Sequence, residues 1–404
     1  MNKIFNPTDI LIPKDAPMEK WSVVACDQFS SEHEYWEKAA EIVGDSPSTL
    51  KMIIPEAFLE DINEEEEIAK ISSTMKKYLD TNIFKKLTNS YVYVVRTQPD
   101  GRKRRGLVGA VDLEAYDFTR ADVPIRASEG TVLDRLPPRI RVRRQASLEL
   151  PHIMTFIDDK DNLVLGFLEK IEKELPLLYD FELMLGGGSV KGMQVVGENA
   201  QNVLLAMDEL YKKNHMLMVM GDGNHSLAAA KVYWNELREG LSESERENHP
   251  GRFALVEVNN VYDDAIDFEA IHRVAFDVNP EDILKEFIEA MPKGNDYTLH
   301  WHAQGKSGEI LVAAHSIADL YTVMQEFLDK CELEKGARVD YIHGDDSLIK
   351  LSEGENAFGL ILPSMAKSEL FASVADRGVF PKKSFSIGHA RDKRYYLECR
   401  EIAN

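Results

Sequence analysis

The chain has 404 residues, of which 44% are hydrophobic and 29% are charged, and these values are typical of a soluble globular protein with two or three structural units. Its formal net charge of −21 argues against a protein that coats nucleic acid, and apolar runs such as residues 216–220 are too short to span a bilayer. The N-terminal segment lacks the apolar core of a signal peptide, and the three cysteines form no CxxC pair. We therefore expect a cytoplasmic protein without a disulfide framework or a zinc site.

The N-terminal third contains one predicted hairpin and two predicted helices. Residues 21–26 have the pattern of a short strand that ends at Asp27 and Gln28. Helices are expected over residues 32–42 and 55–79. Residues 91–96 and 105–113 are expected to pair as strands around a turn at Asp100 and Gly101. Asp27 and Gln28 are either pocket residues or caps of a turn.

Arginines concentrate in two places, which is informative in so acidic a chain. Those at residues 102–105 belong to the hairpin tip, where charges are usually solvated. The second cluster comprises Arg135, Arg139, Arg141, Arg143 and Arg144. The alternation of three of them predicts that one face of a strand presents a row of guanidinium groups to a small anionic ligand.

A glycine-containing loop just before this cluster holds Glu129 among Arg126, Thr131 and Arg135. One interpretation is a general base or metal ligand beside arginines that hold an anion. The other is a glutamate near a helix N-cap beside surface arginines.

The middle of the chain alternates strands and helices. Residues 153–157, 181–185 and 193–196 are expected to be strands, and residues 164–175 and 199–213 helices. The glycine-rich residues 186–192 lack the spacing of a P-loop and are interpreted as a hairpin loop.

The most informative segment is the junction that follows residues 216–220, a predicted buried strand. Gly221, Asp222 and Gly223 form a tight turn, and the residues after them begin a helix. Backbone N–H groups and the positive end of the helix dipole suit a phosphate or a carboxylate there. Asp222 and His225 are able to hold a metal or move a proton. The alternative is an ordinary turn followed by an Asn or Ser N-cap.

The C-terminal part is expected to be a separate α/β domain, with strands over residues 297–302, 310–313, 339–343, 358–362 and 395–400 and helices over residues 317–331 and 367–377. Before it, residues 253–259 and 268–274 have strand patterns, and the second places His272 and Arg273 on an apolar background. These two are either a packed pair or site residues. Lys382, Lys383 and Ser384 form a loop that either faces solvent or closes over an anionic substrate.

Four blocks in this order resemble the bacterial domain-of-unknown-function family 1015. They are residues 125–131 with Arg135, residues 220–226, residues 271–274 and residues 380–385. The resemblance implies a ParB/sulfiredoxin-like fold shared with free serine kinases. It also implies phosphate contacts by Gly223, Asn224, His225 and Ser226, with Asp222 near a metal or the transferring group.

The chain departs from the family pattern at three positions. Asn224 replaces a His and Ser226 replaces an Arg of the central motif, so a bidentate phosphate clamp is lost. Ser128 precedes Glu129 where the family often has His-Glu. Arg135, Arg139 and Lys231 are candidates for the missing charge.

We therefore expect an α/β protein with a ParB/sulfiredoxin-like mixed-sheet core over residues 1–290 and a C-terminal α/β domain over residues 291–404. The expected function is that of a small-molecule enzyme that binds a phosphorylated or carboxylated metabolite or a nucleotide, with phosphoryl transfer involving a serine-like hydroxyl. The alternatives are a non-catalytic metabolite-binding module and a degenerate family member with a structural role.

The expected cofactors are ADP or ATP with Mg²⁺, and the expected partner is a small anionic metabolite, with no nucleic acid and no membrane; a homo-oligomer is allowed. The expected catalytic residues are Asp222, which is also the candidate metal ligand, His225 and Glu129. The expected phosphate- and substrate-binding residues are Gly223, Asn224, Ser226, Arg126, Thr131, Arg135, Arg139, Lys382, Lys383, Ser384, His272 and Arg273.

Overall fold

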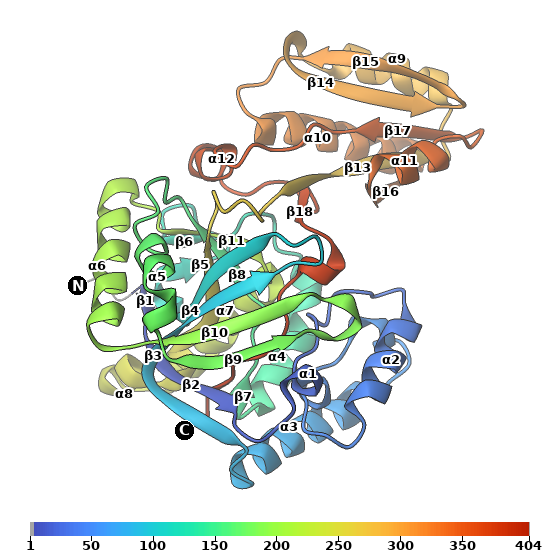
Figure 1. Ribbon diagram of the computed structural model, residues 1–404. Helices are drawn as coiled ribbons and strands as arrows, with labels where there is room; N and C mark the ends of the chain where they lie inside the picture. Colours follow the sequence, from blue (N-terminus) through green and yellow to red (C-terminus); the bar gives the residue numbers. More distant parts are fainter. Residues whose placement is uncertain (1–3, 404) are drawn as a thin grey trace. The chain divides into compact units, whose positions relative to one another are not determined.

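The computed structural model describes residues 4–403, and these divide into two compact units (Figure 1). The first unit contains the described residues up to Ala127, then Thr131–Ile266 and the residues from His389 onward. The second contains Ser128–Gly130 and Asp267–Gly388. The expected α/β class with a large mixed sheet is confirmed.

The units differ from the expected division between residues 290 and 291 in two ways. The strand that begins at Phe268 pairs only with strands of the second unit, so that unit begins before residue 290. The last residues return to the first unit, where Arg400 and Glu401 pair with Glu149 and Leu148. Neither pairing has a local sequence signal, because each joins segments that are distant along the chain.

The first unit is built on one mixed sheet, which has eleven strands within residues 4–403. Its main path runs β5-β6-β11-β8-β12-β4-β3-β10-β9, with β1 beside β4 and β2 beside β3. The strands of this unit are β1 (Phe5–Asn6), β2 (Thr8–Pro13), β3 (Phe84–Thr97), β4 (Lys103–Asp112), β5 (Tyr116–Asp117), β6 (Ile125–Arg126), β7 (Leu148–Glu149), β8 (Met154–Ile157), β9 (Leu177–Glu182), β10 (Ser189–Val195), β11 (Met218–Asp222), β12 (Phe253–Asn260) and β19 (Arg400–Glu401). The helices are α1 (Met18–Trp21), α2 (His33–Val43), α3 (Glu64–Asp80), α4 (Leu136–Gln145), α5 (Gly166–Lys170), α6 (Gly197–Asn214), α7 (Asn224–Arg238) and α8 (Glu243–Asn248).

Both faces of this sheet are buried, as the side chains of β3 show. Tyr91 and Tyr93 belong to one hydrophobic core, which also takes in residues of α6 and α7. Val92 and Val94 belong to a second core, which includes residues of α2. Successive side chains of a strand point to opposite faces, so the sheet separates the two cores.

Most predicted elements of the first unit are confirmed. They include the hairpin of β3 and β4, the hairpin of β9 and β10 at the glycine-rich loop, and the junction of β11 with α7. The predicted strands at residues 21–26 and 395–400 are wrong for most of their length. Within the first, only Val24 forms a bridge, to Tyr395, and within the second Arg400 begins β19.

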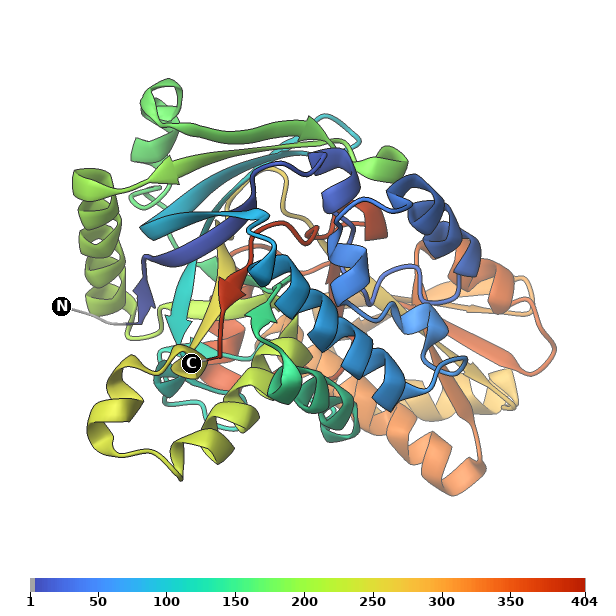
Figure 2. The same cartoon turned by 90° about the horizontal axis from the view of Figure 1, so that it is seen from below.

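The predicted strand of arginines is also wrong, because Arg139, Arg141 and Arg143 lie on helix α4. Two prolines, Pro137 and Pro138, lie in its first turn, where a missing N–H group is tolerated. The helix packs against α3 and α7 (Figure 2). Its arginines are therefore spread around the helix and form ion pairs with different elements.

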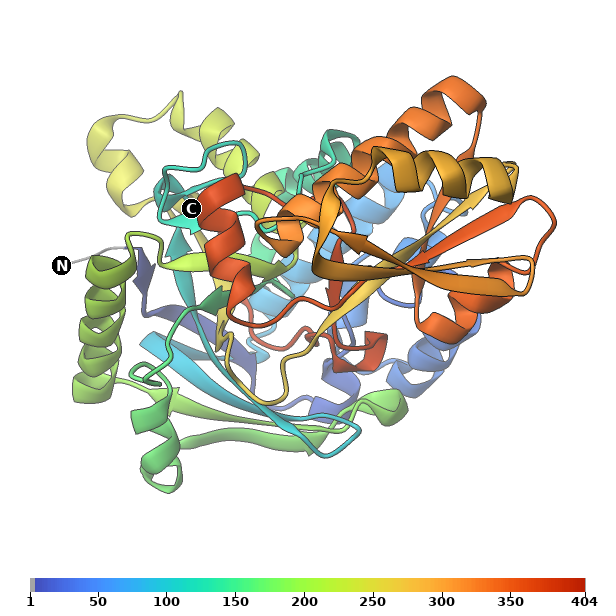
Figure 3. The ribbon, with the colours of Figure 1, turned by 90° about the horizontal axis from the view of Figure 1, so that it is seen from above.

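The second unit has its own antiparallel sheet, in the order β15-β14-β17-β13-β16 with β18 beside β13. Adjacent residues of β17 face opposite sides of this sheet, because Phe358 contacts Phe287 of α9 while Gly359 faces Leu348 of α11. Figure 3 shows the strands and helices of this unit from above. The strands are β13 (Phe268–Phe276), β14 (Lys293–Ala303), β15 (Lys306–Val312), β16 (Arg338–His343), β17 (Ala357–Ile361) and β18 (Phe385–Ile387). The helices are α9 (Pro280–Ala290), α10 (Ile317–Lys335), α11 (Asp345–Leu351) and α12 (Glu369–Arg377). No helix within residues 4–403 has the length and apolar character needed to cross a membrane.

Replacing Gly223 by Ala is expected to lower the free energy of unfolding by about 1–2 kcal/mol, because its φ of 77° is left-handed and strained for any residue with a Cβ. An added Cβ would also lie 3.0 Å from the Ile153 Cα atom. Urea unfolding measures the change. Gly240→Ala is the matched control, since the nearest atom to its Cβ is 3.8 Å away. Equal effects of the two substitutions would contradict the assigned turn geometry.

Candidate functional site

The junction between β11 and α7 holds Asp222 in a fixed position. Its Oδ1 atom accepts a hydrogen bond of 2.8 Å from the Gly223 amide. Its Oδ2 atom lies 3.3 Å from the Lys393 Nζ atom, which belongs to the C-terminal segment of the same unit. Asp222 therefore stabilises the turn and forms an ion pair with a nearby lysine, and both of its carboxylate oxygens are engaged.

A cleft of about 450 Å³ opens beside the first turns of α7. Arg135, Pro138 and Arg139 line it from the start of α4, and Ser226 and Ala229 line it from α7. Apolar side chains from residues 52–54 and Leu150 form much of the remaining wall. A largely apolar cleft of this volume with a few convergent polar groups is typical of a small-molecule site.

Three arginines of the α4 segment, Arg135, Arg139 and Arg143, line this cleft. Arg139 forms an ion pair with Glu56, and Arg143 forms one of 2.8 Å with Glu149. Arg135 is exposed and makes no ion pair with any residue in the described part of the chain. No side-chain hydrogen bond caps the start of α7. The uncapped helix end and the unpaired Arg135 guanidinium are both suited to an anion.

Three residues that sequence reasoning did not group together, Asp27, His152 and Tyr396, form a hydrogen-bonded and charged set at the cleft. His152 and Tyr396 line the cleft, and the His152 Nδ1 atom lies 2.9 Å from the Tyr396 Oη atom. The His152 Nε2 atom lies 3.8 Å from Asp27 Oδ2. The Tyr396 hydroxyl also accepts a hydrogen bond from the Cys26 amide. A carboxylate that faces one imidazole nitrogen and a hydroxyl that faces the other can orient the ring and support a proton on it.

The charge state of Asp27 suits this role. Burial raises the pKa of its carboxyl, but His152, the Gln28 amide, Lys393 and Arg139 together hold that pKa below its ordinary value. Asp27 is therefore ionised at neutral pH and presents a carboxylate to the His152 ring. The sequence left open whether Asp27 is a pocket residue or a turn cap, and nothing near His152 or Tyr396 in the sequence showed that the fold joins the three.

His225, a predicted catalytic residue, is engaged differently. Its Nε2 atom accepts a hydrogen bond of 3.2 Å from the Val132 amide, so the ring proton is assigned to Nδ1. Burial, and then the charges of Arg139 and Arg135, lower the pKa of His225 to about 4. The side chain is therefore neutral at pH 7 and cannot accept a proton at Nε2 without losing its bond to the backbone.

The stability of the protein is expected to fall as the pH drops from about 6.5 toward 4, in part through His225. Its pKa is lower in the folded protein than the ordinary 6.5, so the unfolded chain binds more protons in this window. Urea unfolding at several pH values measures the effect, and His225→Gln should show a smaller loss. NMR titration of the His225 ring protons gives the pKa directly. A midpoint near 6.5 would contradict the assigned environment.

The other predicted residues of the first unit lie outside the cleft lining. Asn224 is buried in the first turn of α7. The Arg126 Nε atom donates to the Val123 carbonyl, and burial lowers the pKa of its guanidinium. The Thr131 hydroxyl is buried and makes no hydrogen bond to any residue between 4 and 403. Of the predicted binding residues, Arg135, Arg139 and Ser226 line the cleft.

The remaining predicted residues belong to the second unit. Glu129 accepts a hydrogen bond of 2.8 Å from the Lys383 amide, and Lys382 and Lys383 lie 5.8 and 5.0 Å from the centre of the Tyr341 ring. The buried Arg273 stacks on that ring at 4.4 Å. The other two predicted residues of this unit also have partners within it. Ser384 Oγ donates to the Pro381 carbonyl, and His272 Nε2 lies 2.8 Å from Asp345 Oδ1.

A metal site with three or more protein ligands is not present within residues 4–403. No group of three His, Cys, Asp or Glu side chains is placed to share an ion there. This finding does not concern metal sites in which a substrate phosphate supplies most of the ligands, as is common for Mg²⁺.

Comparison with known proteins gave a family match and several distant structural matches. A family model described as "Protein of unknown function (DUF1015)" matches residues 9–379. No curated protein sequence matches the chain. A conserved hypothetical protein from Pyrococcus furiosus is 9% identical with a TM-score of 0.37, and the match covers 73% of this chain and 94% of that one. SbnI from Staphylococcus aureus, with a C-terminal truncation, is 10% identical with a TM-score of 0.38, covering 70% and 82%. A free serine kinase in complex with AMP is 11% identical with a TM-score of 0.39, covering 72% and 91%.

Proposed function

The chain belongs to the DUF1015 family of proteins of unknown function, and from this premise we propose that it is a small-molecule enzyme that binds a phosphorylated or carboxylated metabolite in the cleft beside α7. The observation that carries the proposal is the lining of that single cleft. It combines Arg135, which makes no ion pair within residues 4–403, with Ser226 of the first turn of α7 and with the His152–Tyr396 pair. An anion-binding end and a proton-transfer group thus lie in one cleft.

The anion end is formed by Arg135 and the first turn of α7. Arg135 is an exposed guanidinium, so an incoming phosphate or carboxylate is able to accept two parallel hydrogen bonds from it. Ser226 adds a hydroxyl from the helix, and the helix dipole favours negative charge at the same place. Arg139 is a weaker candidate for ligand contact because Glu56 already forms an ion pair with it.

The proton-transfer group of the proposed enzyme is His152. Asp27 is ionised and faces its Nε2 atom, while Tyr396 Oη hydrogen-bonds its Nδ1 atom. This arrangement allows His152 or Tyr396 to give a proton to, or take one from, a hydroxyl-bearing substrate held in the cleft. In phosphoryl transfer, as the sequence resemblance implies, Mg²⁺ would be bound mainly by the phosphates, and Asp222 would become a protein ligand only on release of its ion pair with Lys393.

Isothermal titration of the full chain tests the proposal, with ATP, ADP, phosphoserine and inorganic phosphate as probes, each with and without Mg²⁺. We expect at least one of the four to bind, and its binding to be lost at high salt because the anion end is exposed. Phosphorus NMR of the protein with ATP, Mg²⁺ and serine then tests transfer. The absence of heat with every probe would overturn the proposal in this form.

A second candidate function is non-catalytic binding of the same class of ligand, as in a metabolite sensor. It is favoured by the engagement of two predicted catalytic residues: Asp222 pairs with Lys393, and His225 is neutral and bonded to the backbone. The two functions predict different turnover. An enzyme turns over its substrate, and His152→Gln abolishes that turnover while binding is kept. A sensor binds the ligand without any measurable turnover, even in the unchanged protein.

A further inference from the structure

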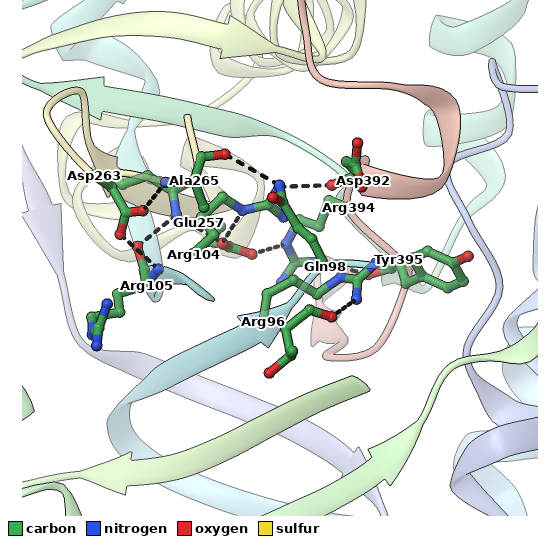
Figure 4. Close-up of polar contacts among 12 residues, drawn as sticks. Arg96, Gln98, Arg104, Arg105, Glu257, Asp263, Ala265, Asp392, Arg394 and Tyr395 are labelled. Atoms are coloured by element: carbon green, nitrogen blue, oxygen red, sulfur yellow. Dashed lines mark hydrogen bonds and ion pairs between the residues drawn. The ribbon is translucent and has the colours of Figure 1, made fainter. Parts of the chain in front are cut away.

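A second polar site lies inside the first unit, away from the cleft lining, in a cluster of buried charged side chains (Figure 4). Arg96 comes from β3, Arg104 from β4 and Glu257 from β12, while Arg394 and Glu398 come from the C-terminal segment. All five are buried, with exposed fractions from 0% to 4%. Such groups are rarely removed from water unless each charge is compensated.

The two carboxylates of the cluster are fully engaged. Arg394 donates to Glu257 at 2.8 Å and to Glu398 at 2.6 Å. The remaining oxygens accept hydrogen bonds from Asn259 and from the Tyr179 hydroxyl. Arg104 lies 3.8 Å from Glu257, which is within range of an ion pair but too long for a hydrogen bond.

Arg96 is the charge that the cluster does not compensate. Its terminal nitrogens donate to the backbone carbonyls of Thr97, Ser189 and Arg391, and it makes no ion pair with any residue between 4 and 403. Burial and then the like charge of Arg104 lower the pKa of Arg96 to about 10, against the opposing effects of Tyr395, Asp392 and Glu257. Three guanidinium groups and two carboxylates therefore meet in the cluster, and the carboxylate of Asp392, outside it, adds a further attraction for Arg96.

The cluster also encloses unused space and unused donors. A cavity of about 20 Å³ is lined by Arg96, Arg104 and Arg394, and every residue of its lining is buried. The Nε–H groups of Arg96 and Arg104 make no hydrogen bond within the described part of the chain. A space of this size accommodates one water-sized group.

We propose that this cavity is a binding site for one small monatomic anion of halide size, which in the cell is chloride. A halide only accepts hydrogen bonds, so it matches two free N–H donors, and its charge offsets the third guanidinium. A water molecule would satisfy the donors but leave the buried positive charge uncompensated. The ion would link β3 and β4 to the C-terminal segment. It would raise the free energy of unfolding, independently of any ligand in the cleft.

Crystals of the full chain soaked in sodium bromide test the site directly. We expect an anomalous bromide peak in the cavity, within hydrogen-bond distance of the Nε atoms of Arg96 and Arg104. A cavity that holds only water, or nothing, while bromide binds elsewhere on the protein would overturn the proposal.

Thermal unfolding provides the solution test, with chloride or bromide compared with gluconate at constant ionic strength. Above the dissociation constant, each tenfold rise in halide should raise the Tm by about 2–4 °C, and gluconate, which is too large for the cavity, should not do so. Arg96→Gln should abolish the halide dependence, whereas the exposed control Arg120→Gln should keep it. Equal halide dependence in both variants would contradict the site, and if Arg96→Gln does not fold, the bromide map decides.

Discussion

Replacing Arg394 by Met lowers the free energy of unfolding by an expected 3–5 kcal/mol, about the cost of breaking a buried ion pair. Arg394 is 4% exposed and bonds to two buried carboxylates, Glu257 and Glu398, as well as to the Pro151 carbonyl. Removing it leaves two negative charges without their main partner. Although burial raises the pKa of Glu257, Arg394 and then Arg104 hold it below its ordinary value. The loss is therefore largest at neutral pH, where Glu257 is ionised.

Urea unfolding at neutral pH measures this effect, with Arg144→Met as the matched control. Arg144 also forms an ion pair, with Glu236, but both side chains are about half exposed. Arg144→Met should lower the free energy of unfolding by less than about 1 kcal/mol. Adding Glu257→Gln and Glu398→Gln to Arg394→Met should recover part of the loss, because the unpaired charges are removed. A loss below about 1 kcal/mol for Arg394→Met would show that the cluster does not bind the C-terminal segment as described.

Replacing Arg135 by Gln is expected to weaken the binding of any anionic probe in the cleft by about tenfold to a hundredfold, the usual contribution of hydrogen bonds to a charged group. Arg135 is exposed and forms no ion pair within residues 4–403, so the substitution should leave stability nearly unchanged. Isothermal titration measures the binding of the same four probes to both proteins.

Arg141→Gln is the matched control for this experiment. Arg141 lies on the same helix and carries the same charge, but it pairs with Glu64 and does not line the cleft. The control should bind within about twofold of the unchanged protein, apart from a small long-range effect of lost charge. If Arg135→Gln and Arg141→Gln weaken binding equally, general charge and not a contact explains the affinity.

Local patterns in the sequence were sufficient for the elements whose signals are local. The predicted turn at Asp100 and Gly101 is confirmed, and so is the junction of a strand with a helix near residue 222, although the strand extends through Asp222 and only Gly223 separates it from the helix. The arginine helix α4 was misassigned because Ile140 and Val142 alternate with arginines as they would in a strand. The adjacent Pro137 and Pro138 were a usable signal, since prolines are typical of the first turn of a helix.

The residues that line the cleft were harder to predict from the sequence, because the lining depends on contacts between segments that are distant along the chain. Asp27, His152 and Tyr396 are joined only when the C-terminal segment returns to the first unit. Equally, nothing local indicates that Glu129 belongs with Lys383 in the second unit while Thr131 belongs to the first. The proposed anion end could be anticipated from the junction and Arg135, whereas the proposed proton-transfer end could not.

A crystal structure of the full chain soaked with ADP and Mg²⁺, and in parallel with phosphoserine, is the most direct test of the proposed function. It should show a phosphate group within hydrogen-bond distance of the Arg135 guanidinium and close to Ser226, with the rest of the ligand in the cleft toward His152 and Tyr396. A cleft that contains only solvent after both soaks, or a ligand bound at another place on the protein, would contradict it.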